Sequence, residues 1–248
     1  MRKKFQMMVR DYKLLKCLSR GPATRRHIYE EIYAKKGSKK ETRRRIMIRR
    51  LAKLERAGLI ASTTCPTVAD TIYYLLPQAA PIVASLYGME VSYIPTNYNA
   101  NTLQHDLFAA GCHRKIRKDA EDKKLYKLSY VIPECGLKKG SKLKRGVYFP
   151  DLLFAIKNGE RTDTVYLEVD CGNISRLVFA GKMNYFSGTI LVVTQTATRL
   201  ALLLRYLAAD GITKPVYLTT LKSFFAADLP ACKWDTNFSK EKVSLDIF

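Results

Sequence analysis

The chain has 248 residues, enough for one large domain or two modest ones with a sizeable buried core. With 47% hydrophobic and 26% charged residues, and only 13 Gly and 9 Pro, it cannot be collagen-like, low-complexity or wholly disordered. Its 43 Lys and Arg against 22 Asp and Glu give a net charge of +21. Such an excess favours a polyanionic partner, nucleic acid first.

No targeting or membrane segment is predicted. The basic N-terminus is not followed by the apolar stretch of a signal peptide, and no window approaches the ~18 apolar residues of a membrane span. The six cysteines are widely spaced and form no CxxC pair, which is typical of reduced thiols. We therefore expect a cytoplasmic protein with no membrane contact. A zinc site from Cys112, His113 and His105 is conceivable but disfavoured by the spacing.

Residues 1–76 predict three helices followed by two strands. The helices are expected over 11–20, 24–33 and 39–57, with Gly21 and Gly58 as C-terminal stops. The strands are expected over 59–62 and 71–76 around a polar turn. This order is that of a winged helix-turn-helix.

The third of these helices is strongly basic. A helix fits the DNA major groove, where arginine contacts phosphates or guanine edges. Repulsion within such a cluster favours a polyanion over the two alternatives, a solvated basic face and a dimerisation helix. We therefore predict binding of double-stranded DNA by Lys39, Lys40, Arg43, Arg44, Arg45, Arg49 and Arg50.

A connector follows over residues 77–100, which hold three prolines and no cation. A short helix is expected near 79–88, and the domain boundary is expected at 90–100, giving domains 1–90 and 91–248. The second domain is expected to open with a helix over 101–120 and a strand at 125–132. A basic loop before residue 146 is a candidate phosphate-binding arm.

A hairpin is predicted around Asn158-Gly159. Because side chains alternate along a strand, Glu168 and Asp170 share one face. Asp151, on the opposing strand, is expected nearly opposite them. Three carboxylates this close raise one another's pKa unless a cation joins them, so Mg²⁺ or Mn²⁺ is predicted. The alternative is a solvent-facing strand edge whose acids only keep the protein soluble.

A helix over about 174–186 is expected to place Lys182 near these carboxylates. Its ammonium could stabilise a developing phosphorane charge or orient an attacking water. A strand from 189, a helix from 196 and a strand over 214–224 complete a mixed α/β core.

Pro150-Asp151, Glu168-Val169-Asp170 and the Lys182–Tyr185 segment resemble the PD-(D/E)xK nuclease superfamily. Here Asp170 takes the place of the usual strand lysine, and the lysine stands in the following helix. Together with the winged helix, the chain resembles the replication-relaxation family and, more narrowly, the MobC-type relaxases of mobilisable plasmids. The resemblance covers about 100–225 and 10–76. It implies a restriction-endonuclease-like fold after the winged helix, an α/β chain of mixed α+β character.

The resemblance further implies a metal-dependent endonuclease that nicks one strand of plasmid DNA at an origin of transfer. Asp151, Glu168 and Asp170 would hold the metal, and Lys182 and His105 would assist catalysis. A coupling protein and an accessory mobilisation protein are implied partners. Tyr185 is expected to be a core aromatic, and its alternative role is that of a nucleophile forming a covalent link to DNA. The same alternative applies to Tyr166, which lies on the carboxylate face of its strand.

Two other functions remain open. One is a non-catalytic DNA-binding regulator of plasmid replication or transcription with a degenerate nuclease core, which Asp170 at the lysine position would favour. The other is a dimeric transposition or restriction endonuclease that cuts both strands.

Overall fold

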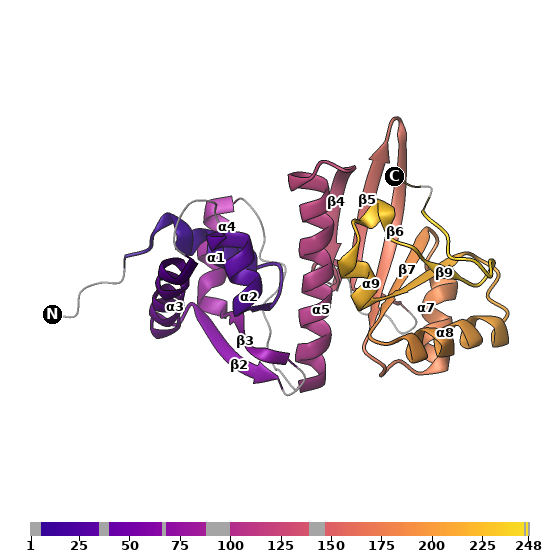
Figure 1. The fold of residues 1–248 in the computed structure, drawn as a ribbon, viewed down its shortest axis with the longest axis horizontal. Coiled ribbons are helices and arrows are strands. Elements are labelled where there is room, and N and C mark those ends of the chain that lie inside the picture. The colour runs from indigo at the N-terminus through magenta and orange to yellow at the C-terminus, as the bar shows by residue number, and fades with distance from the viewer. Residues whose placement is uncertain are drawn as a thin grey trace. The chain divides into compact units, whose positions relative to one another are not determined.

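The computed structural model describes residues 6–34, 40–65, 68–87, 100–138, 147–245 and 247. The chain divides into two compact units, Met1–Gly111 and Cys112–Phe248. We call them the N-terminal and the C-terminal unit and describe each by itself (Figure 1).

The N-terminal unit has the element order of a winged helix-turn-helix. Gly21, with φ of +124°, follows the first helix, and the Thr24 hydroxyl caps α2 by accepting a hydrogen bond from the His27 N–H. The antiparallel sheet has the order β1-β3-β2, as a winged helix requires. The elements are α1 (Val9–Leu18), β1 (Ala23–Thr24), α2 (Arg25–Ile28), the π-helical η1 (Tyr29–Tyr33), α3 (Lys40–Arg56), β2 (Ile60–Cys65) and β3 (Val68–Leu75).

One face of α3 is anchored in the core of this unit. Met47, Leu51 and Leu54 are almost fully buried and belong to the same apolar cluster as Leu14 and Leu18 of α1. These α3 positions recur at the helical spacing of three and four residues. One side of α3 is therefore buried, and the basic residues on its other sides can face solvent.

The division between the units falls inside a helix rather than at the expected 90/91 boundary. After η2 (Pro77–Ala79) and α4 (Ala80–Tyr87) comes α5 (Ala100–Arg117). Its first turns belong to the N-terminal unit because Leu103 and Leu107 pack with Cys65 and Ile72 of the winged-helix sheet. Gly21 also lies so near α5 that an added Cβ would come within 2.6 Å of the Ala110 Cβ.

The C-terminal unit is built on a six-stranded mixed sheet of order β4-β5-β6-β7-β8-β9. The first three strands are antiparallel, β6, β7 and β8 are parallel, and β9 is antiparallel to β8. The elements after α5 are η3 (Lys118–Asp122), β4 (Lys127–Pro133), α6 (Glu134–Lys138), β5 (Leu152–Asn158), β6 (Arg161–Asp170), α7 (Arg176–Tyr185), β7 (Thr189–Thr194), α8 (Ala197–Ala209), β8 (Val216–Thr220), α9 (Leu221–Ala226), η4 (Leu229–Ala231) and β9 (Asp235–Thr236).

Helices pack on both faces of this sheet (Figure 1). Phe179 and Met183 of α7 and Leu203 of α8 form a core with β7 and β8 on one face. α9 packs against β7 and β8 on the other face, where Lys115 of α5 lies 5.6 Å from the centre of the Phe224 ring. The predicted helix, strand, hairpin, helix and strand are found in this order, with the short α6, which was not predicted, between β4 and β5.

The predicted strand over 214–224 is wrong beyond Thr220. The Thr220 hydroxyl accepts a hydrogen bond from the Ser223 N–H, and this cap begins α9. The strand therefore ends at Thr220, where capping of the next helix replaces further pairing in the sheet. Within the described part of the chain, we found no helix with the length and apolar character of a membrane span.

Candidate active site and nucleic-acid interface

Two carboxylates meet where β5 begins beside the end of β6. Leu152 pairs with Leu167 in the antiparallel ladder, so Asp151 stands opposite Glu168, as predicted. Oδ2 of Asp151 accepts a hydrogen bond of 2.6 Å from the Val169 N–H, which fixes its side chain. Both residues are buried, with 5% exposure each. Buried carboxylates require nearby positive charge, and the strand register alone does not supply it.

Lys182 of α7 supplies that charge. Its Nζ donates a hydrogen bond of 2.6 Å to Oε2 of Glu168. Burial lowers the pKa of Lys182, but the negative charges of Glu168, Asp151 and Glu134 outweigh burial and raise that pKa above its ordinary value. The ammonium therefore stays protonated at neutral pH. The structure brings together three predicted site residues: Asp151, Glu168 and Lys182.

Asp170 is separated from the predicted three-carboxylate cluster. Its Oδ2 accepts a bond of 2.5 Å from Nε of Arg199, and its Oδ1 accepts one of 3.1 Å from the Gly172 N–H. Arg199 also donates to the Ile174 carbonyl at 2.6 Å, so the ion pair fixes the segment that follows β6. Among the described residues, no group of three or more His, Cys, Asp and Glu side chains could hold a metal ion.

Arg199 was missed by the sequence analysis, although the chain carries a signal for it. Asp170 pairs with Thr194 in the parallel ladder of β6 and β7, so the residues just after β7 lie beside it. Thr196 caps α8 by accepting from the Arg199 N–H, which places Arg199 in the first turn of that helix. An arginine there could have been predicted as a partner of Asp170.

The remaining carboxylate pair has the right chemistry for Mg²⁺ or Mn²⁺. These hard cations prefer oxygen ligands, and Mg²⁺ is commonly held by one or two carboxylates together with substrate phosphates. Asp151 and Glu168 supply two carboxylates at one point. Glu134 also acts on Lys182, but its carboxylate is paired with Lys138 at 2.7 Å. Asp151 and Glu168 together therefore leave one negative charge in excess of the Lys182 ammonium. The donor set therefore fits such an ion.

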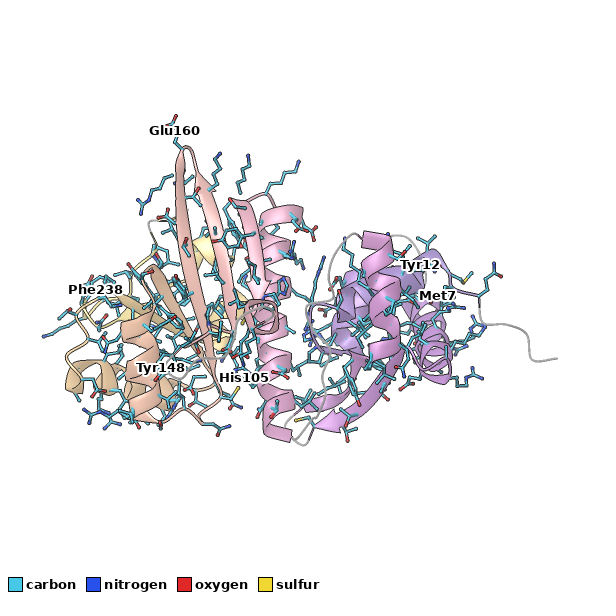
Figure 2. The ribbon with its side chains drawn as sticks, turned by 180° about the vertical axis from the view of Figure 1, so that it is seen from behind. Met7, Tyr12, His105, Tyr148, Glu160 and Phe238 are labelled. Carbon is cyan, nitrogen blue, oxygen red and sulfur yellow. The ribbon has the colours of Figure 1, made fainter. Side chains whose placement is uncertain are left out.

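Tyrosines surround this end of β5 and β6. Tyr185, expected in the core, is 51% exposed and packs edge to face with Tyr148 at 5.9 Å between ring centres. Tyr148 fits against α7 because residue 181 is glycine: a Cβ there would lie 2.5 Å from the Tyr148 hydroxyl. Figure 2 shows Tyr148 at the end of the hairpin strands remote from Glu160 at the tip. Tyr166 is stacked on Phe186, which gives it a packing role.

His105 falls in the N-terminal unit and not in the unit that carries the carboxylates. Its Nδ1 lies 3.4 Å from Oδ1 of Asp106. Cys112, by contrast, is fully buried in the C-terminal unit, and burial and then the charge of Asp151 raise its thiol pKa. His113 is buried too, and its Nε2 accepts a hydrogen bond from Arg117. These contacts give Cys112 and His113 packing roles.

The exposed side of α3 carries a row of cations. Lys40, Arg44, Arg45 and Arg49 are exposed, and Lys53 and Arg56 extend the row toward the end of the helix. Arg44 also lies over the Tyr29 ring at 5.9 Å, and Arg45 pairs with Glu41 at 3.3 Å. A stripe of this kind on the third helix of a winged helix suits the charged backbone of a polyanion.

Three of the predicted DNA-binding residues differ from this row. Arg50 is only 9% exposed and forms a buried ion pair with Asp11, its Nε donating to Oδ1 at 2.8 Å, so its assignment to DNA is wrong. Arg43 is half-buried and donates to the Tyr33 carbonyl at 3.2 Å. Lys39 lies outside the described residues.

Comparison with known proteins gives little further information. No family model and no curated protein matches the chain. The crystal structure of Bacillus subtilis PadR in complex with operator DNA is similar at 18% sequence identity, covering 56% of this chain and 82% of that one, with a TM-score of 0.27.

Proposed function

We propose that this protein is a metal-dependent DNA endonuclease that binds double-stranded DNA through α3 and nicks one strand at the Asp151, Glu168 and Lys182 cluster. The proposal includes a PD-(D/E)xK-like character for the C-terminal unit and, as the biological setting, a plasmid origin of transfer. The observation that carries it is the buried pair Asp151 and Glu168 on adjacent strands, with Lys182 at 2.6 Å from Glu168.

In this proposal Asp151 and Glu168 hold a Mg²⁺ or Mn²⁺ ion. Such an ion supplies Lewis-acid polarisation of a phosphodiester and a more acidic water. The hydrogen bond from Val169 keeps the Asp151 carboxylate oriented before substrate arrives. Lys182 acts as a cation that stabilises charge on the phosphate oxygens, because its raised pKa excludes an unprotonated amine at neutral pH.

The test is nicking of supercoiled plasmid that contains an origin of transfer, with Mg²⁺ or Mn²⁺ added. We expect Glu168→Ala to abolish nicking and Lys182→Ala to slow it by roughly 10²–10³-fold. Glu160→Ala is the matched control, since Glu160 is an exposed glutamate at the tip of the same hairpin. If Glu168→Ala nicks as fast as the wild type, the proposal fails.

A second function is favoured by a separate observation. Glu168 pairs with Lys182 and Asp170 pairs with Arg199, so both are already compensated by protein cations. Such a cluster can be purely structural, and the protein would then be a DNA-binding regulator without catalysis. Salt-sensitive duplex binding without cleavage in any divalent metal identifies that case. Linear rather than nicked product identifies a dimeric endonuclease.

A further inference from the structure

A pocket of about 530 Å³ lies beside β4 in the C-terminal unit, far from the carboxylates. β4 is the first strand of the sheet, so one of its edges has no neighbouring strand among the described elements. The end of α5 and the turn after it form the other wall. Polar lining residues include Arg117, Glu121, Lys124, Lys127, Ser129 and Tyr130.

The pocket has an excess of positive charge after its internal ion pair is formed. Arg117 and Glu121 bind each other at 2.6 Å. Lys124 and Lys127 are exposed, and neither forms an ion pair with any residue that the structure describes. Lys127 pairs directly with Lys157 across the β4–β5 ladder, and like charges in such positions repel each other. An anion placed between these lysines would relieve that repulsion.

A β-bulge adds an aromatic ring to the same surface. Residues three apart in a regular strand point to opposite faces, but the register shifts between Leu128 and Tyr130. Tyr130 therefore pairs with Ala155 and Lys127 with Lys157, two residues apart on β5 and thus on one face. The Tyr130 side chain is among the exposed large hydrophobic groups, at 40% exposure.

We propose that this pocket and the adjoining face of the β4–β5 strand pair bind single-stranded DNA, with phosphates on Lys124, Lys127 and Lys157 and an unpaired base stacked on Tyr130. Cations that track a backbone beside an exposed aromatic ring are the two elements of single-strand binding, and a duplex keeps its base faces stacked internally. The pocket holds no reacting group of the proposed nuclease, since Lys157 is about 20 Å along β5 from Asp151. The inference goes beyond the proposed function and depends on neither α3 nor the carboxylates.

The experiment is fluorescence anisotropy with the full-length chain, a short labelled oligothymidylate and a duplex of equal length. Arg44→Ala with Arg49→Ala serves as background, so that α3 contributes little. We expect Tyr130→Ala to weaken oligothymidylate binding roughly tenfold or more and Tyr130→Phe to retain it, because stacking needs only the ring. Lys127→Ala with Lys157→Ala should reduce the slope of log affinity against log salt by roughly 0.7 for each lysine.

Lys222→Ala is the matched control, an exposed lysine of α9 that should leave binding unchanged. The proposal is overturned if Tyr130→Ala and the double lysine variant both bind oligothymidylate as tightly as the background protein does. The proposal is also overturned if Tyr130→Ala weakens the binding of duplex and of oligothymidylate by the same factor, because that result would indicate contact with the backbone alone. An acidic peptide that competes as well as oligothymidylate overturns it as well.

The two proposals fail separately. A Glu168→Ala protein that still binds oligothymidylate supports the pocket whatever the outcome of the nicking assay. Thermal unfolding monitored by circular dichroism shows whether each variant is folded. If Tyr130→Ala is unfolded, Tyr130→Ser replaces it with the same expected loss.

Discussion

At the residue scale, Arg49 and Arg50 show how neighbouring arginines take different roles. Arg49 is exposed on the basic side of α3, whereas Arg50 is buried against Asp11. Asp11 is fully buried, so loss of its partner Arg50 leaves an uncompensated carboxylate in the core. The free energy of folding and the affinity for DNA should therefore depend on different members of one basic run.

We expect Arg50→Ala to lower the free energy of unfolding by about 3–5 kcal/mol, because it breaks a buried ion pair. Arg49→Ala should change that free energy by less than about 0.5 kcal/mol and weaken duplex binding instead. Urea unfolding and duplex anisotropy measured on both variants test this. Equal stability of the two variants would contradict the assignment of Arg50 to the core.

Lys182 carries a pH-dependent prediction. Its pKa is raised in the folded protein, so the stability it contributes is fully present below the ordinary value of 10.5 and is lost as pH rises through the folded pKa. The difference in unfolding free energy between wild type and Lys182→Met should be constant from neutral pH up to that value and then shrink. Urea unfolding across an alkaline pH series measures it, with Lys222→Met as the control that should show no such change.

At the element scale, α3 combines a buried apolar side with an exposed basic one. Arg45, Arg49 and Lys53 recur every four residues and Arg56 follows three residues later, so these cations can follow a DNA backbone along one side of the helix. No other helix in the described part of the N-terminal unit has as many basic residues. The salt dependence of duplex binding should therefore be a property of this helix.

We expect Arg44→Ala and Arg49→Ala each to reduce the slope of log affinity against log salt by about 1, the value of one phosphate contact. Lys13→Ala is the control, since Lys13 is an exposed cation on α1. Duplex titrations at several salt concentrations give the slopes. A slope that changes as much in Lys13→Ala as in the α3 variants would show that net charge, not this helix, governs binding.

At the scale of the whole molecule, the two units have separate apolar cores. Leu54 lies in the core of the N-terminal unit, and Phe154 is fully buried in the C-terminal unit. Chains with several domains commonly unfold in more than one step. We therefore expect two calorimetric transitions.

Leu54→Ala should lower the free energy of one transition by about 2–5 kcal/mol, and Phe154→Ala should lower that of the other by about 3–5 kcal/mol. Differential scanning calorimetry of both variants identifies which transition each affects. A single transition shifted by both substitutions would mean that the units unfold together.

Much of the fold followed from local pattern. Glycine stops and helical spacing predicted the winged helix, and strand alternation placed Asp151 opposite Glu168. Two assignments failed: that of Arg50 used charge without packing, and that of Tyr185 used aromatic character without its place in the helix. Arg50 shares its helix side with Met47 and Leu54, which the helical period of 3.6 residues would have indicated. Tyr185 is exposed because it closes the last turn of α7, beyond the buried Met183.

Other features depend on contacts between residues far apart in the chain. Asp170 meets Arg199 only because β6 and β7 are parallel neighbours, a pairing that no local pattern specifies. The bulge that brings Tyr130 beside Lys127 is likewise set by pairing with β5. Prediction from one sequence reached the individual strands but not these registers.

The packing of Leu103 and Leu107 on the winged-helix sheet determines where the polypeptide can be cut. A fragment that stopped at residue 90 would lack both leucines and expose Cys65 and Ile72. Exposed apolar surface of this kind promotes aggregation. Extending the fragment through Gly111, the last residue of the N-terminal unit, retains that cover, because the first turns of α5 carry both leucines. Proteolysis or expression trials that seek a free DNA-binding piece should therefore keep the first turns of this helix with the N-terminal half.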